Sequence, residues 1–100
     1  MAYSPEWHKG IVGIVAGRIK EAENRPVFVL TAGKDDTLTG SGRSIPGFHL
    51  KHALDQISAQ HPDMFKAFGG HAMAAGVTLN PGMLDRFRHA FEAQARKDLS

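Results

Sequence analysis

The sequence contains no cysteine, which excludes a disulfide framework, a thiolate zinc site and a cysteine nucleophile. It also lacks a long hydrophobic run. The longest mainly apolar stretch, residues 10–17, is far shorter than the roughly 20 residues that span a bilayer. The first residues contain neither a basic segment nor an apolar one of the kind found in secretory signals. We therefore expect a cytoplasmic protein that contacts no membrane.

Neither charge sign dominates: 12 Lys and Arg oppose 10 Asp and Glu, for a formal net charge of +2. This balance permits contact with a polyanion but does not drive strong nonspecific binding, because each neutralised phosphate needs its own cation. The 100 residues suffice for one domain, and 42% hydrophobic content is typical of a globular protein.

Apolar spacing predicts a helix over residues 10–23, ended by the Asn24-Arg25-Pro26 segment. Gly13 and Gly17 within it are expected to let the helix lie close to a sheet. The run at 26–31 predicts a buried strand, and the sequence 33–36 predicts a turn.

A second strand is expected at 37–44, where Gly40 and Gly42 indicate bulges or a close approach to the backbone. A short amphipathic helix should start near Leu50 and end at His61-Pro62. Residues 64–68 fit no element clearly. A short strand follows at 77–79, and the last helix should begin with Asn80 as its N-cap and Pro81 in its first turn.

The resulting order is helix, strand, strand, helix, strand, helix. It predicts an α/β (α+β) fold with a mixed β-sheet packed against helices in a single small domain. Because the first helix follows only a handful of residues, we also expect that a strand before it is cut off.

The first segment with chemical potential is Trp7-His8-Lys9-Gly10, at the expected start of the first helix. Free N–H groups and the helix dipole attract anions there, and Trp7 offers a stacking face for a base. The alternative is structural: Trp7 belongs to the core and His8 lies next to the cap.

The second segment is Gly40-Ser41-Gly42-Arg43-Ser44. Two hydroxyls, glycine-exposed N–H groups and one guanidinium within five positions suit a phosphate ligand. An ordinary polar turn is the alternative, because the segment lacks the Gly-Lys-Ser/Thr ending of a P-loop.

The third segment, residues 68–76, places Gly69, Gly70 and His71 before a run of small residues. Such a backbone can be approached closely, and the imidazole can donate to a phosphate. A lone histidine is more often structural, but no packing stripe accounts for these small residues, so we interpret the segment as a site.

The fourth segment places His49, His52 and Asp55 on one helical face. The histidines are three residues apart rather than four, and no zinc-helix motif surrounds them. We interpret this face as solvated and assign no metal ligands in the chain.

The order and spacing of residues 7–19, 25–27, 40–44 and 68–76 resemble the DHH-associated domain of the RecJ family, single-stranded-DNA-specific exonucleases of the DHH phosphoesterase superfamily. The resemblance implies a parent enzyme of DNA recombination and repair that acts 5′ to 3′ with Mn²⁺ or Mg²⁺. In that family a preceding DHH domain holds the metals, and no Asp-His-His triplet occurs in this sequence. We therefore expect residues 6–98 to be the DHH-associated domain, inactive alone, and residues 1–5 to be a linker or residues added for expression.

Carried over by position, the resemblance implies that Ser41 and Arg43 hold the 5′-terminal phosphate of single-stranded DNA, with Ser44 nearby. Gly69, Gly70 and His71 would face the metal centre of the parent's DHH domain, where His71 stabilises charge on the scissile phosphate. His8 and Gly10 are further candidates for the same wall.

Two other functions stay open. One is a domain of another DHH-type phosphodiesterase that cleaves short oligonucleotides or cyclic dinucleotides. The other is an interdomain docking module that touches no substrate.

Overall fold

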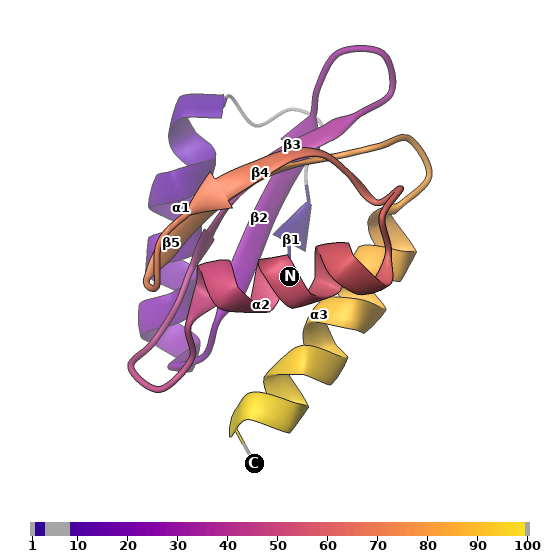
Figure 1. The fold of residues 1–100 in the computed structure, drawn as a ribbon. Helices are drawn as coiled ribbons and strands as arrows, with labels where there is room; N and C mark the ends of the chain where they lie inside the picture. The colour runs from indigo at the N-terminus through magenta and orange to yellow at the C-terminus, as the bar shows by residue number, and fades with distance from the viewer. Residues whose placement is uncertain (1, 4–8, 100) are drawn as a thin grey trace.

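The computed structural model describes residues 2–3 and 9–99, which form one sheet with helices on both sides (Figure 1). In chain order the elements are β1 (Ala2–Tyr3), α1 (Lys9–Glu23), β2 (Val27–Ala32), β3 (Leu38–Arg43), α2 (Leu50–Gln60), β4 (Phe65–Gly70), β5 (Ala74–Leu79) and α3 (Leu84–Leu99).

The sheet is mixed, as the sequence predicts. Its strand order is β1-β2-β3-β5-β4; β1 runs parallel to β2, and the other neighbours are antiparallel. Ala2 and Tyr3 pair with Val29 and Leu30. Ala2 and Tyr3, which the sequence leads us to expect in a linker, thus form a two-residue strand that leaves no pattern in the sequence.

Side chains of β2 point alternately to the two sides of the sheet and build two cores. Val27 and Val29 pack with Ala16 of α1, which is fully buried. Phe28 and Leu30 point the other way and join α2 and α3. Because both sides are apolar, β2 reads as a continuous hydrophobic run.

The larger core centres on Phe28, whose ring meets Phe87 and Phe91 of α3 edge-on at centroid distances of 5.1 and 5.0 Å. Both α3 rings belong to the apolar stripe that predicts the last helix, and both are buried. Within the described residues, no helix combines the length and the apolar character needed to cross a membrane.

The α1 helix ends as predicted. Asn24 adopts the left-handed conformation (φ 53°), and its N–H donates to the carbonyl of Lys20 at 2.7 Å. The sequence predicts that Gly13 and Gly17 let the helix lie close to the sheet. At Gly13 an added Cβ would lie 2.8 Å from Arg43 Nη2, the end of a flexible side chain of β3, so glycine there leaves space for the guanidinium. For Gly17 the prediction is wrong, because an added Cβ meets nothing within 4 Å.

Replacing Gly17 by alanine is therefore expected to stabilise the chain by about 0.5–1 kcal/mol, the usual difference between the two residues inside a helix. For a domain of this size the melting temperature should rise by a few degrees, to about 8 °C at most, in a thermal unfolding experiment. Gly13→Ala is the matched control, since its methyl group presses on the guanidinium. A Gly17→Ala variant that melts below the parent would contradict this packing.

Gly40 and Gly42 are explained by the larger core. β3 pairs without interruption from Leu38 to Arg43 with both neighbours, so the bulge alternative is wrong. The close-approach alternative is confirmed: a Cβ on Gly42 would come within 2.5 Å of the Phe28 ring. At Gly40 the added atom would collide with the backbone of β2.

Two sequence assignments are corrected by the structure. Residues 64–68, left unassigned, mostly belong to β4, and β5 begins at Ala74 rather than 77. Gly and Ala, which disfavour strands, make up half of β4 and half of β5, so sheet pairing overrides local propensity.

The start of α3 also differs from the prediction. Asn80 does not cap the helix, because its Nδ2 donates to the carbonyl of Asp63 at 2.8 Å and so holds the end of β5 to the loop before β4. Gly82 adopts a left-handed conformation (φ 78°), and the helix starts only at Leu84.

Candidate functional site

The two glycine-rich motifs, far apart in sequence, lie next to each other in the sheet. Ser41 of β3 lies opposite Gly76 of β5. Arg43 lies opposite Ala74 in the same ladder. On the other side of β5, Gly69 of β4 lies opposite Gly76. A row of Ser41, Gly76 and Gly69 therefore crosses three strands.

Strand alternation places Ser41 and Arg43 on the α1 side of the sheet, away from α2 and α3. A Cβ built on Gly13 of α1 would lie 3.7 Å from Ser41 Oγ and 2.8 Å from Arg43 Nη2. Both side chains are partly exposed. The hydroxyl and the guanidinium thus lie where α1 meets the uncovered part of the sheet.

The same alternation identifies the rest of this surface, which we call the open face: the α1 side of β3, β5 and β4. Its residues are Thr39, Ser41, Arg43, Ala67, Gly69, Ala74, Gly76 and Thr78. It contains a shallow hollow of about 300 Å³, lined by Thr39, Gly40, Ala67, Phe68, Gly69, Gly76, Val77 and Thr78.

Sequence reasoning missed Thr39, Thr78 and Ala67. Thr39 and Thr78 are opposite each other in the β3–β5 ladder, and Ala67 is the partner of Thr78 on β4. The available signal is period two: counting back from Ser41 and on from Gly76 reaches both threonines. That signal becomes usable only when the strands and their register are known.

The glycines of the site differ in what the fold requires of them. Gly70 has φ 144°, and a Cβ there would lie 2.5 Å from the carbonyl oxygen of Ala74, so only glycine fits. Gly69 has space for a Cβ, and at Gly76 an added Cβ would make only an ordinary 3.7 Å contact with the Gly40 oxygen. Mid-strand glycine without a packing reason typically marks a close approach of another molecule to the backbone.

The loop between β4 and β5 is held by backbone hydrogen bonds. The carbonyls of His71 and Ala72 accept from the N–H groups of Lys51 and Leu50, at 3.3 and 2.8 Å. The carbonyl of Met73 accepts from Ser44 N–H at 2.9 Å. Figure 1 shows this turn beside the first residues of α2. The loop that carries His71 is therefore anchored to the helix start and to the end of β3.

The electrostatic environment of the open face favours an anion. Neither residues 37–54 nor residues 64–84, which include β3, β4 and β5, contain an Asp or Glu. Arg43 donates through Nη1 to its neighbour's carbonyl, Gly42 O, at 2.8 Å. Among the described residues, none of the ion pairs involves Arg43, so the guanidinium keeps donors for a ligand.

Ser44 has a structural position instead. It is fully buried, and its hydroxyl donates to the carbonyl of Phe48 at 2.7 Å. Since its N–H also binds Met73, Ser44 joins the end of β3 to the loop before α2 and to the β4–β5 loop. We therefore leave Ser44 out of the group that meets a ligand.

His71 is exposed, and no side-chain hydrogen bond or ion pair in the described part of the chain involves its ring. Gly10 lies in the first turn of α1. His8 and Trp7 lie outside the described residues.

The side chains of the His49-His52-Asp55 face have separate partners. His49 is the N-cap of α2 and accepts from His52 N–H at 3.1 Å through Nδ1. His52 bonds to Gln56, and Asp55 pairs with Lys51 at 2.7 Å. Across residues 2–3 and 9–99, no three or more His, Asp or Glu side chains gather as a metal would require.

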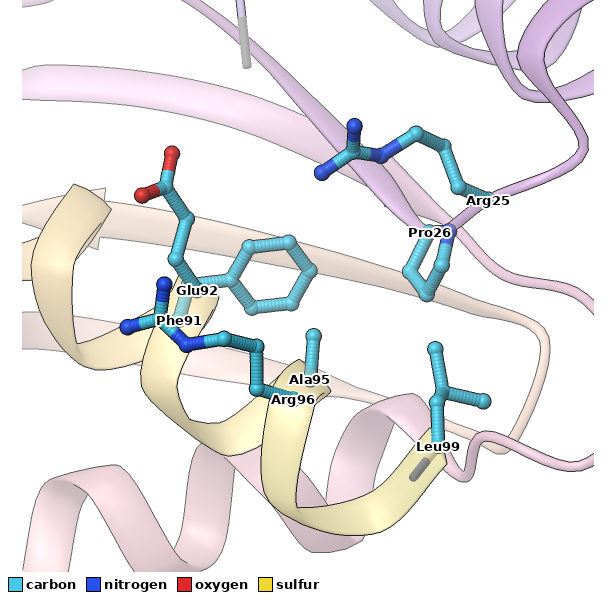
Figure 2. Close-up of a pocket in the computed structure, with 7 residues that line it drawn as sticks. All are labelled: Arg25, Pro26, Phe91, Glu92, Ala95, Arg96 and Leu99. Carbon is cyan, nitrogen blue, oxygen red and sulfur yellow. The ribbon is translucent and has the colours of Figure 1, made fainter.

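A second concavity, of about 650 Å³, lies on the opposite side of the sheet (Figure 2). Its lining is Arg25, Pro26, Phe91, Glu92, Ala95, Arg96 and Leu99. Figure 2 shows apolar side chains of α3 facing Pro26 across the groove. Leu99 is 45% exposed, so this groove leaves apolar surface in contact with solvent. We call it the α3 groove.

Comparison with protein families matches residues 1–97 to the DHHA1 domain. The single-stranded-DNA-specific exonuclease RecJ of Dickeya dadantii is 51% identical over 89 residues, and that of Salmonella typhimurium is 49% identical over 89 residues. These alignments cover 89% of this chain but only 16% and 15% of the relatives. The chain thus spans a small part of the proteins it matches.

Solved structures agree. RecJ from Thermus thermophilus in complex with Mg²⁺ superposes with a TM-score of 0.80 at 36% identity, covering 96% of this chain and 14% of that one. The C-Ala domain of Aquifex aeolicus alanyl-tRNA synthetase shares only the fold, with a TM-score of 0.66 at 14% identity over 99% of this chain and 90% of that domain.

Proposed function

The chain belongs to the DHHA1 domain family, and from this membership and the open face we propose that it is the substrate-binding domain of a RecJ-type exonuclease. The parent would remove nucleotides from single-stranded DNA in the 5′-to-3′ direction. The relatives named RecJ, at about half identity, favour this parent over a phosphodiesterase for cyclic dinucleotides or short oligonucleotides.

One observation carries the proposal: Ser41 and Arg43 lie beside the small residues of β5 and β4 on a face without carboxylates. In this proposal the hydroxyl and the guanidinium hold the 5′-terminal phosphate, since arginine can donate to two phosphate oxygens at once. Gly76 and Gly69 let the strand approach the sheet backbone. Phosphate contacts of this kind position a strand without reading its sequence.

In this proposal His71 is the residue of this chain that lies nearest to the phosphodiester bond that is cleaved. Its exposed imidazole stands on an anchored loop at the edge of the open face, and it donates to an oxygen of the scissile phosphate. A donor fixed before the reaction stabilises developing negative charge without a reorganisation cost.

The metal ions belong elsewhere in the proposed parent. Thermus RecJ structures contain Mg²⁺ or Mn²⁺. The described residues of this chain offer no converging set of carboxylates and histidines, so the donor set does not fit a metal site. We propose that the parent's DHH catalytic domain holds the ions.

Salt dependence of strand binding tests the proposal. With two or three phosphates contacted, the affinity of the 100-residue chain for a short 5′-phosphorylated single strand should fall with a log–log slope of about −1.4 to −2.1. Fluorescence anisotropy between about 20 and 200 mM NaCl measures this slope. Intact binding with a slope near zero would contradict a phosphate grip.

The α3 groove supports a second candidate function, docking onto the parent's DHH domain without substrate contact. The observation behind it is the apolar surface around Leu99, together with the large share of the relatives' length that this chain does not span. The docking candidate predicts that Arg43→Ala leaves the nuclease activity of the full-length parent unchanged, while Leu99→Asp impairs it.

A further inference from the structure

We infer that the backbone N–H groups of Ala72 and Met73 form an anion-binding pair that receives a phosphate next to Arg43. This inference rests on the proposed function and adds a specific atomic seat for the phosphate. It assigns a ligand-binding role to two residues whose side chains are a methyl group and a thioether, neither of which suggests one.

The hydrogen bonds of the β4–β5 loop fix the directions of its peptide groups. His71 O accepts from Lys51 N–H, and Ala72 O accepts from Leu50 N–H, so both carbonyls point to the start of α2. In a trans peptide the carbonyl of one residue and the N–H of the next point in opposite directions. No cis peptide occurs among the described residues. The N–H groups of Ala72 and Met73 therefore both point away from α2.

These two donors have no backbone acceptor within the described part of the chain. Ala72 is partly exposed, and Met73 is 39% exposed. Successive N–H groups that face the same side form a concave seat for an anion. The anchoring bonds hold both peptide planes before any ligand arrives, so little ordering cost is left for binding.

The neighbourhood supplies a matching charge. Met73 precedes Ala74, the register partner of Arg43, and Met73 O is bonded to Ser44, the residue after Arg43. The Arg43 guanidinium therefore extends from β3, the strand whose end is hydrogen-bonded to the β4–β5 loop. Because residues 37–54 and 64–84 contain no carboxylate, no acidic side chain of these segments competes for the donors.

The first turn of α2 is fully used by this arrangement. Its N–H groups at Leu50, Lys51 and His52 are taken by Ala72 O, His71 O and the His49 ring. The N–H groups at the start of α2 are therefore not available to an anion. The loop carbonyls that accept from them point toward the helix, so the N–H groups of Ala72 and Met73 point away from it.

The test is a titration of the ¹⁵N-labelled 100-residue chain with inorganic phosphate, with sodium chloride at matched ionic strength as the control. The amide protons of Ala72 and Met73 should move downfield, because a charged acceptor deshields the proton of its donor. Both signals should give the same dissociation constant, because both amides bind one phosphate. Arg43→Gln should raise that dissociation constant about tenfold, while the amide signals of Ala72 and Met73 still shift on addition of phosphate. Phosphate that leaves both amides unmoved overturns the inference.

Two further arms separate this inference from the proposed function. A short single strand with a 5′-phosphate should move the same amides more than the strand with a 5′-hydroxyl. If the phosphorylated strand shifts Thr39, Gly69 and Thr78 but neither loop amide, the amide seat is wrong and strand binding on the open face stands. If phosphate moves the loop amides but no strand binds, the seat stands and the proposed function fails.

Discussion

Replacing Gly70 by alanine is expected to cost about 3 kcal/mol or more of folding free energy. The added Cβ would lie 2.5 Å from both the Ala74 oxygen and the Ala75 Cα, and φ is 144°. Backbone strain and overpacking of this kind each cost about 1–3 kcal/mol. For a domain of this length, 3 kcal/mol lowers the melting temperature by more than about 12 °C, measurable by circular dichroism.

The matched control is Gly69→Ala, one residue earlier on the same strand. A Cβ at Gly69 meets nothing within 4 Å, so the Gly69→Ala variant should be as stable as the parent or more stable by up to about 1 kcal/mol. A Gly70→Ala variant that melts with the parent would show that the β4–β5 loop is not as described. Gly69 and Gly70 would then not differ in whether the fold requires glycine at each position.

Replacing Arg43 by alanine is expected to weaken binding of a 5′-phosphorylated single strand about tenfold or more. Hydrogen bonds from a charged group contribute about 1.5–3 kcal/mol, and the guanidinium is the one permanently charged group we assign to the open face. The loss should be smaller for a 5′-hydroxyl strand, because that strand lacks the terminal dianion. Fluorescence anisotropy at about 20 mM salt measures both affinities.

Two variants make this result specific. Arg25→Ala removes the same charge from an exposed residue that lines the α3 groove on the opposite side of the sheet, and it should change affinity little. Arg43→Lys keeps the charge but loses the paired donors, and should give an intermediate affinity. Equal losses for Arg25→Ala and Arg43→Ala would reduce the effect to net charge and contradict a defined phosphate site.

Strong local patterns made much of the fold predictable from the sequence. α1 and α2 follow apolar periodicity, and β2 follows a continuous apolar run. β4 was missed because its Ala and Gly residues have low strand propensity and acquire their structure from pairing with β5. The start of α3 was placed too early because Asn80, a good cap by type, binds the carbonyl of Asp63 instead.

The sequence also indicated which segments belong to the candidate site but not how their residues divide the work. Ser41, Arg43 and Ser44 are all polar residues of one short motif, and the sequence pattern alone suggests the same role for each. Strand alternation places Ser41 and Arg43 on the open face, whereas Ser44 is buried. Gly40 and Gly69 likewise cannot be distinguished from the sequence, because each is a glycine in a glycine-rich motif. Only the three-dimensional structure shows that Gly40 meets the backbone of β2 while Gly69 has space around it.

In the proposed function, single-stranded DNA binds across β3, β5 and β4 on the α1 side of the sheet. Amide shifts of the ¹⁵N-labelled chain, measured with and without a short 5′-phosphorylated strand, locate the surface that the strand contacts. The shifts should be concentrated on the open face and on residues 71–73, and they should be larger than those caused by the 5′-hydroxyl strand. Shifts concentrated instead along the α3 groove, or a dispersed spectrum that the strand leaves unchanged, would contradict the proposed function.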